Sequence, residues 1–347
     1  MTLGRIAFLG SGETSLAGGR IFETLARLHP DPPRVAVLET PAGFELNSAS
    51  VAGRVADFLR TRLQNYSPRV DVVPARKRNS PFSPDDPEIL KPLLDANLIF
   101  MGPGSPTYVV RQLKDTLAWD IIRARHRMGA TLVFASAATI SVGAWVLPVY
   151  EIYKVGQDVH TLPGLNFFAD FGVPLSFIPH WNNAEGGADL DTSRCFIGMD
   201  RFAQWCDLLP SDHAIVGLDE HTGLILDFEK NECTISGVSS VSLVRECDPE
   251  IYAAGKTFPL TELGNFKIPV LEDGISSTAL DLMQKAVRVE EETPDAETLS
   301  LLDARQKARA LKDWAASDRL RDEIASRGWS VTDSAQGQVL KKSVSQP

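Results

Sequence analysis

The feature that most restricts the fold is an alternation of short apolar runs with helical patterns through the first half of the chain. The predicted strands are 5–9, 34–38, 70–73, 98–101 and 131–135, and the predicted helices are 20–28, 49–63, 86–94 and 108–127. Strands followed by helices at this spacing form parallel βαβ units with right-handed crossovers. The sequence therefore predicts an α/β fold with a doubly wound, mostly parallel sheet, whose functional groups lie at the carboxyl ends of the strands.

The remainder of the chain changes character. Short β-like pieces between residues 175 and 244 are expected to extend the same sheet and to add hairpins. The acidic stretch 289–297 lacks apolar rhythm and is typical of a linker, whereas apolar residues after 298 recur at helical spacing. We predict an α/β domain over 1–255, a connecting segment with an acidic linker over 256–297, and a small helical module over 298–342.

The composition is that of a soluble globular protein. The 347 residues contain 35 Lys+Arg and 45 Asp+Glu, a net charge of −10, and 44% are hydrophobic. This charge offers no reason to expect nucleic acid or an anionic membrane as the main partner. There is no apolar run of transmembrane length and no signal-peptide pattern at the N-terminus, so we expect a cytoplasmic protein. The sequence does not determine the oligomeric state, and a homo-oligomer is one of the alternatives.

No metal or cofactor is predicted. The four cysteines lack zinc-knuckle spacing and are expected to be reduced thiols; the histidines outside the candidate site also lack ligand spacing. The turn Gly10-Ser11-Gly12-Glu13-Thr14-Ser15 follows a strand, but Ser15 stands where a dinucleotide fingerprint has its third glycine. A plain glycine turn is the favoured interpretation.

Ser136 is the strongest candidate for chemistry. It follows the strand 131–135 directly and precedes the small residues Ala137, Ala138 and Thr139. A serine at a sharp strand-to-helix turn exposes its hydroxyl, and the next backbone N–H, at Ala137, points to where an oxyanion forms. The same serine could instead be the N-cap of the following helix.

A second loop supports the first interpretation. The strand 98–101 ends in Gly102-Pro103-Gly104-Ser105-Pro106-Thr107, just before a helix. Such a loop can present a backbone N–H at Gly104, since Pro103 has none. Two N–H groups from adjacent strand ends would form an oxyanion hole.

With these motifs in place, the stretch from Arg5 to about Arg245 resembles the cyanophycinase and aspartyl dipeptidase family. That family is a branch of the class I glutamine amidotransferase-like fold, and its members are serine peptidases. Phe134 and Ala138 stand where the family's elbow has glycines. The matching runs are Gly102-Pro103-Gly104-Ser105, Ser136-Ala137, Leu147 to Lys154, Ile178 to Asn183, and Gly217-Leu218-Asp219-Glu220-His221-Thr222.

The resemblance implies a Ser-His-acid triad. Ser136 would attack an amide carbonyl, His180 would take its proton, and Glu151 would orient the imidazole, although Glu151 could also pair with Lys154 or Arg194. The N–H groups of Ala137 and Gly104 would hold the oxyanion. The candidate substrate contacts are Ser105, Asn182, Asn183, Glu185 and Arg194.

The C-terminal module has a resemblance of its own. Lys312-Asp313-Trp314 and the run from Ser317 to Asp322 are similar to the C-terminal end of cysteinyl-tRNA synthetases. No nucleotide-binding signature of a synthetase occurs elsewhere, so aminoacylation is not implied. The candidate RNA contacts are Arg305, Arg309, Lys312, Arg319 and Arg321; a solvated charged face is the other interpretation.

Together these observations predict a serine hydrolase, peptidase-like, that cleaves a peptide or related amide. The alternative is a catalytically silent homologue that binds a small acidic or peptide ligand. In that case the module would contact tRNA or a protein partner. The two hypotheses differ in whether the Ser136 hydroxyl lies within hydrogen-bond reach of His180.

Overall fold

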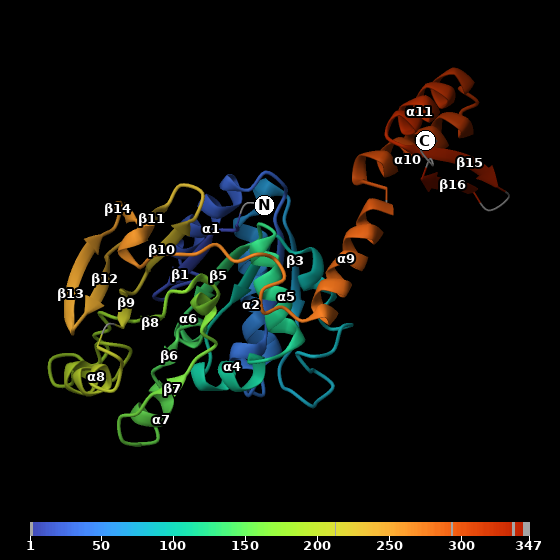
Figure 1. Ribbon diagram of the computed structural model, residues 1–347. Coiled ribbons are helices and arrows are strands. Elements are labelled where there is room, and N and C mark those ends of the chain that lie inside the picture. The colour runs from blue at the N-terminus through green and yellow to red at the C-terminus, as the bar shows by residue number, and fades with distance from the viewer. Residues whose placement is uncertain (1–2, 212, 293, 335–336, 343–347) are drawn as a thin grey trace. The chain divides into compact units, whose positions relative to one another are not determined.

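The computed structural model describes residues 3–211, 213–292, 294–334 and 337–342, and the chain divides into two compact units, Met1–Leu282 and Met283–Pro347. The first unit is built on an eight-stranded sheet of order β14-β11-β10-β1-β5-β4-β2-β3 (Figure 1). Five of its strands, from β1 to β3 in that order, pair in parallel, which confirms the predicted class. The strands are β1 Ile6–Leu9, β2 Arg34–Leu38, β3 Arg69–Val73, β4 Leu98–Met101, β5 Thr131–Ala135, β10 Thr222–Asp227, β11 Glu232–Gly237 and β14 Thr257–Pro259.

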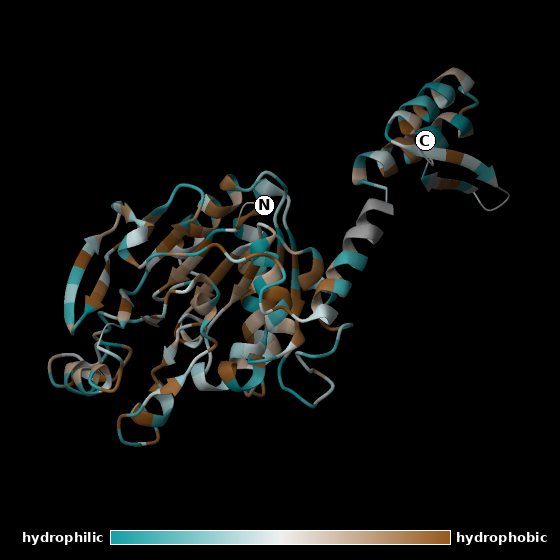
Figure 2. Ribbon diagram, viewed as in Figure 1, coloured by the Kyte–Doolittle hydropathy of each residue, from teal (hydrophilic) through white to brown (hydrophobic). Residues whose placement is uncertain are grey.

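The sheet packs on both of its faces through buried apolar side chains. Ala7 and Leu9 of β1 pack with α1 (Leu16–Leu28) and α2 (Ser48–Arg62) in one apolar cluster. Phe8, between them, points to the opposite face, where its ring lies 4.1 Å from that of Phe177. Successive residues of a strand face opposite sides, so a strand buried on both faces needs apolar residues throughout. Figure 2 accordingly shows the central strands as largely hydrophobic.

The later strands do not all extend this sheet, contrary to the expectation from the sequence. A second sheet has the order β13-β12-β9-β8, with β8 and β9 parallel. The apolar pattern of these segments predicted strands correctly but holds no information on which strand is their partner. Its strands are β8 Leu175–Ile178, β9 Ala214–Leu218, β12 Ser240–Arg245 and β13 Asp248–Ala253.

The helix expected over 108–127 is two helices in the structure. Asp115 has a left-handed φ of 56°, and the Thr116 hydroxyl accepts from the N–H of Trp119, which starts a new helix. The remaining helices, short strands and turns of this unit connect the strands of its two main sheets. They are α3 Lys91–Asp95, α4 Pro106–Leu113, α5 Leu117–Arg127, α6 Ala137–Ser141, α7 Val149–Tyr153, α8 Gly198–Cys206, β6 Trp145–Val146, β7 Leu162–Pro163 and the 3-10 turns Thr40–Ala42, Gln64–Tyr66, Phe167–Phe171 and Leu260–Glu262.

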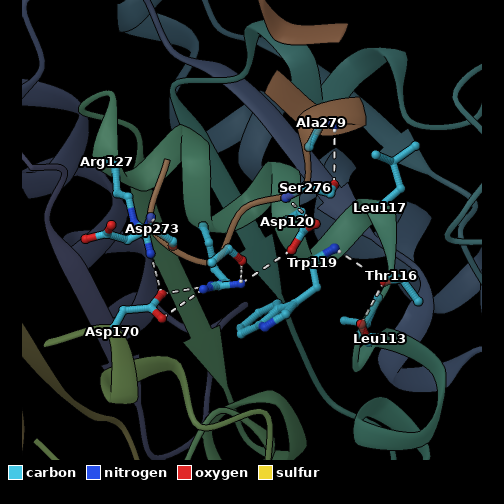
Figure 3. A network of polar contacts seen from close by, with 12 residues as sticks. Leu113, Thr116, Leu117, Trp119, Asp120, Arg127, Asp170, Asp273, Ser276 and Ala279 are labelled. Atoms are coloured by element: carbon cyan, nitrogen blue, oxygen red, sulfur yellow. Dashed lines mark hydrogen bonds and ion pairs between the residues drawn. The ribbon is translucent and has the colours of Figure 1, made fainter. Parts of the chain in front are cut away.

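The α/β unit extends beyond residue 255, where the sequence placed its end. β14 pairs with β11, and the following segment is fastened by Arg127, which donates to the carbonyls of Val270, Leu271 and Asp273 at 2.9, 3.0 and 2.6 Å. Figure 3 shows Arg127 also bonded to Asp170, at 2.5 Å. The Arg127 side chain is 3% exposed. Segment 256–282 is therefore part of the first unit and not a free connector.

The C-terminal unit contains the expected helices together with one hairpin, but the acidic linker differs from the prediction. α9 (Ser277–Glu292) continues through most of that stretch, and Asp295 then caps α10 (Ala296–Ala310) by accepting from Thr298 N–H at 2.6 Å. Glutamate is a good helix former, so an acidic run is compatible with a helix as well as with a linker. The remaining elements are α11 Trp314–Ser326, β15 Trp329–Ser334 and β16 Gly337–Lys342.

Candidate active site

Ser136 lies at the turn between β5 and α6 with a backbone conformation that few residues adopt. Its φ is 51° and its ψ −117°. It occupies the N-cap position, yet its side chain makes no capping hydrogen bond. Instead its Oγ lies 3.0 Å from Nε2 of His180. The sequence left open whether Ser136 caps the helix or presents its hydroxyl as a nucleophile. In the structure the hydroxyl points away from the helix and toward a base.

His180 follows β8 and is held through both its backbone and its ring. Its backbone N–H donates to the carbonyl of Gly10 at 3.1 Å, and its φ is 49°. The Nδ1 atom lies 2.9 Å from Oε1 of Glu220. A carboxylate only accepts, so it selects the tautomer with the proton on Nδ1, which leaves Nε2 free to accept from Ser136.

The carboxylate that orients His180 belongs to Glu220 and not to Glu151. Glu220 follows β9, the parallel neighbour of β8, so the residues after both strands emerge at one edge. Burial raises the pKa of Glu220, but hydrogen bonds from His180 and Asn183 outweigh it and hold that pKa below its usual value. The signal was present in the sequence, because the run containing Glu220 was one of the family-like motifs and follows a buried strand.

Glu151 has a different partner. It lies on α7, and its Oε1 accepts from the Thr107 hydroxyl at 2.6 Å. Its Oε2 is buried and has no hydrogen-bond partner within the described residues. The sequence assigned Glu151 to His180 through the family resemblance, which does not determine where α7 packs.

Asn182 and Asn183 support the acid, although the sequence assigned them to substrate. The Asn183 amide donates to Glu220 Oε1 at 3.1 Å, and Asn182 Oδ1 accepts from the Glu220 N–H at 2.8 Å. Asn183 is buried. Both side chains thus fix the position of Glu220, a positioning role that requires no contact with a ligand.

The two loops predicted to hold an oxyanion lie next to each other. The N–H of Ala138 donates to Gly102 O at 3.3 Å, and α4 packs against α6. Gly104 has a φ of 152°, and a Cβ there would stand 1.8 Å from the carbonyl of Pro41, so only glycine fits. Neither the N–H of Gly104 nor that of Ala137 donates to an acceptor among the described residues.

Ser105, a predicted substrate contact, is used as a helix cap. Its Oγ accepts from the Tyr108 N–H at 3.2 Å and lies 3.1 Å from the Thr107 hydroxyl. The residue is buried. Its hydroxyl is therefore occupied in starting α4, a local pattern that Ser-Pro-Thr at a strand end also favours.

Arg194 and Glu185, the other predicted substrate contacts, lie on the loop between Trp181 and α8. The Arg194 guanidinium stacks 3.8 Å from the Trp181 ring and donates to that residue's carbonyl at 2.9 Å. Its Nε is buried and lacks an acceptor within the described part of the chain. The next residue, Cys195, donates its N–H to His180 O at 3.1 Å, whereas Glu185 is exposed. Arg194 is thus tied to the loop beside His180.

The glycine turn after β1 has a structural use. Gly10 lies against the backbone of Asp219, and a Cβ at Gly10 would be 2.1 Å from the Asp219 carbonyl oxygen. The Ser11 Oγ accepts from the His221 N–H at 3.2 Å. The turn therefore holds the loops of His180 and Glu220 together. The helix after it also starts at Leu16, earlier than expected.

Phe134 and Ala138 replace glycines of the family pattern without backbone strain. Neither is among the described residues with a positive φ. Phe134 packs its ring 5.6 Å from that of Phe8, and Ala138 is fully buried. The strained conformation falls on Ser136 alone in this elbow, so these two substitutions leave its geometry intact.

No group of three or more His, Cys, Asp or Glu side chains that could hold a metal ion occurs within the described residues. In the same residues, no helix is both long enough and apolar enough to cross a membrane.

Each unit is similar to known proteins. The first has the fold of a solved peptidase from an acI-B1 Actinobacterium, with a TM-score of 0.59 and 21% identity, covering 74% of this chain and 97% of that one. At this identity the likeness establishes the fold alone. The class is thus an α/β fold shared with a peptidase.

The C-terminal resemblance is confirmed at the level of sequence. Residues 293–339 match the family described as the cysteinyl-tRNA ligase anticodon binding domain. A cysteine-tRNA ligase of Streptococcus thermophilus strain CNRZ 1066 is 42% identical over 65 residues, which cover 17% of this chain and 14% of that protein. A cysteine-tRNA ligase of Chlamydia trachomatis serovar A is 48% identical over 46 residues, which cover 13% of this chain and 10% of that protein. The chain thus spans only a small part of these relatives.

The predicted RNA contacts of this unit differ in their burial and in their ion pairs. Arg305 is buried and bonds to Asp333 at 3.0 and 3.2 Å and to Gln338, so it fastens the hairpin and is not a surface residue. Arg309 is 3.3 Å from Asp333, and Arg321 is 3.2 Å from Asp318. Lys312 and Arg319 are exposed.

Proposed function

We propose that the first unit is a serine hydrolase, peptidase-like, that cleaves a peptide or related amide. The observation that carries the proposal is the pair of contacts at His180, 3.0 Å to Ser136 Oγ and 2.9 Å to Glu220 Oε1. This is the arrangement that activates a serine nucleophile, since the base reaches the hydroxyl and an acid orients the base. Glu220 replaces Glu151 in the proposed triad.

The proposed reaction follows from these contacts. Ser136 Oγ attacks the amide carbonyl as its proton passes to Nε2 of His180, and Glu220 stabilises the imidazolium that forms. The N–H groups of Ala137 and Gly104 receive the negative oxygen. His180 then returns the proton to the leaving nitrogen, and water, deprotonated by His180, releases the acyl group from Ser136.

Arg194 remains the proposed substrate contact. Its loop is hydrogen-bonded to His180 through Cys195, and its Nε lacks an acceptor within the described residues. A guanidinium binds carboxylates well, so we propose that the substrate carries a carboxylate near the scissile amide.

Labelling with a serine-directed fluorophosphonate, followed by intact-mass and peptide analysis, tests the hydrolase. The probe is expected to attach to Ser136, and Ser136→Ala or His180→Ala should abolish attachment. Ser50→Ala, at an exposed site on α2, is the matched control and should label normally. Attachment that persists in Ser136→Ala contradicts the assignment; absence of labelling favours the silent ligand-binding homologue.

We propose in addition that the C-terminal unit contacts RNA. Its match to an anticodon binding domain supports this, and so does Trp314, which is 56% exposed with the Arg309 guanidinium 5.4 Å from its ring. Exposed aromatic rings flanked by cations stack on unpaired bases. A filter-binding titration against tRNA, comparing the full chain with one ending near Val289, tests the proposal; equal retention by both chains contradicts it.

A further inference from the structure

Two cysteines that play no part in the proposed site line one surface pocket. Cys206 is the last residue of α8 and is half-buried, while Cys247 is exposed in the turn between β12 and β13. Both line the same surface pocket, and the neighbouring Cys247 helps to raise the pKa of Cys206. The two residues are far apart in sequence, so the fold itself brings these sulfurs together.

A tight turn fixes the backbone of Cys247. β12 and β13 pair up to Arg245 and Asp248, which leaves Glu246 and Cys247 as a two-residue turn. Both have left-handed backbones, with φ of 52° and 62°. This is the conformation that two-residue hairpin turns favour, and it places Cys247 at a defined position.

The pair is accessible to a small molecule, because both cysteines line a surface pocket of about 360 Å³. The other two cysteines offer a contrast, since Cys195 and Cys233 are 4% and 0% exposed. Burial raises the pKa of both of these thiols, which disfavours the reactive thiolate. Burial and the neighbouring Cys247 also raise the pKa of Cys206. The exposed Cys247 is therefore the thiol of the pair that reacts first.

We propose that Cys206 and Cys247 form a dithiol that a peroxide oxidises to a reversible disulfide. The exposed Cys247 loses its proton, and its sulfur attacks the peroxide, so that the O–O bond breaks and Cys247 sulfenic acid and water form. The Cys206 sulfur then attacks the Cys247 sulfur. The S–S bond forms as the S–O bond breaks, and the hydroxyl leaves with the Cys206 proton as a second water.

The disulfide would join two segments that support the candidate site. α8 continues from the loop in which Cys195 bonds to His180, and β12 pairs with β9, the strand that leads to Glu220. A covalent link across so long a stretch of chain restricts the unfolded state more than the folded one. Oxidation is therefore expected to raise the melting temperature by several degrees. This inference does not depend on the hydrolase.

The test treats the reduced full chain with hydrogen peroxide in slight excess, blocks remaining thiols by alkylation, and maps peptides by mass spectrometry. The wild-type chain should lose the mass of two hydrogen atoms, with the link between Cys206 and Cys247, and dithiothreitol should reverse it. Cys206→Ser and Cys247→Ser should each abolish the link and the rise in Tm. Cys195→Ala, the matched control, should retain both.

Three outcomes would overturn the proposal. One is a folded wild-type chain in which Cys206 and Cys247 remain open to alkylation after peroxide treatment. Another is a link that involves Cys195 or Cys233. The third is oxidation of Cys247 only to a dimer between two chains, since the proximity of Cys206 would then not direct the chemistry.

Discussion

His180 and Glu220 each stand two residues beyond the end of a strand, and those strands, β8 and β9, are parallel neighbours with Ile178 opposite Gly217. This pairing brings Nδ1 of His180 to 2.9 Å from Oε1 of Glu220. The carboxyl ends of parallel strands meet at one edge of a sheet, so the contact follows from topology. Asn182 and Asn183, which come directly after Trp181 in the His180 loop, then fix the carboxylate.

Replacing the carboxylate behind His180 should slow the chemistry. Glu220→Gln keeps the shape but allows the amide to present a donor to Nδ1, which favours the wrong imidazole tautomer. We expect the rate of fluorophosphonate labelling of Ser136 to fall roughly ten-thousandfold, by analogy with triads that lose their acid. The measurement is the second-order labelling rate at pH 7.

Glu151→Gln is the matched control for that prediction. Glu151 bonds to Thr107 and not to His180, so its amide variant should label within about tenfold of the wild-type rate. If Glu151→Gln slows labelling as much as Glu220→Gln does, the assignment of the acid to Glu220 is wrong.

The sequence was sufficient for the parallel half of the fold. The runs that became β2, β4 and β5 are continuous apolar stretches bounded by turns, and their observed bounds agree with those expected. For buried parallel strands the apolar run itself is the signal. The sequence did not predict the break between α4 and α5. The break occurs at Asp115, which has a left-handed backbone conformation. The free-energy cost of that conformation can be judged only once the packing of the flanking helices is known.

The site was only partly predictable for a related reason. Ser136 was found from a local pattern, because it follows a predicted strand and precedes small residues, whereas His180 was identified from the family resemblance. Glu220 lies in a run that the sequence singled out, but its place behind His180 depends on which strands pair, and the apolar pattern does not contain that information. Arg305 illustrates the same limit in the C-terminal unit, since helical spacing placed it on a basic face while the hairpin that buries it lies later in the chain.

Acid should destabilise the protein through His126. The ring is fully buried among Phe167, Phe171 and Phe228, and its Nε2 lies 2.8 Å from Gly4 O. Burial lowers the pKa of His126 to about 3. In the unfolded chain the value is about 6.5, so the unfolded state takes up the proton first as pH falls. The stability contribution is complete above about pH 6.5 and declines toward pH 3, by about 2 kcal/mol at pH 5.

His126→Gln separates this effect from other acid-sensitive groups, because the amide can still donate to Gly4 O but does not titrate. Urea unfolding at pH 7 and pH 5 should show a loss of stability that is about 2 kcal/mol larger for the wild type than for the variant. The same pH dependence in both would exclude His126 as the cause.

Removing Arg127 should free the segment that precedes α9. Its guanidinium is the shared donor to the carbonyls of Val270, Leu271 and Asp273. It also pairs with Asp170, as Figure 3 shows. Arg127→Met leaves three carbonyls without their donor, with an expected cost of about 3 kcal/mol. Hydrogen exchange in residues 267–276 should rise selectively. Lys91→Gln, in an exposed pair with Glu88, should cost less than about 1 kcal/mol and leave exchange in that segment unchanged.

Buried and exposed cations of the C-terminal unit should respond differently to substitution. Arg305→Met removes the bonds to Asp333 and Gln338, so the hairpin β15–β16 should exchange its amides faster and the unit should lose about 2 kcal/mol of stability. Lys312→Gln combined with Arg319→Gln changes two exposed residues and should leave exchange unchanged, since neither side chain is buried.

The same double variant tests the proposed RNA contact. If the unit binds tRNA through this surface, the double variant should bind more weakly. The slope of log affinity against log salt should also fall by about 0.7 to 0.9 for each phosphate that the protein no longer neutralises. Filter binding at two salt concentrations measures that slope. A double variant that binds as the wild type does would exclude Lys312 and Arg319 from the interface.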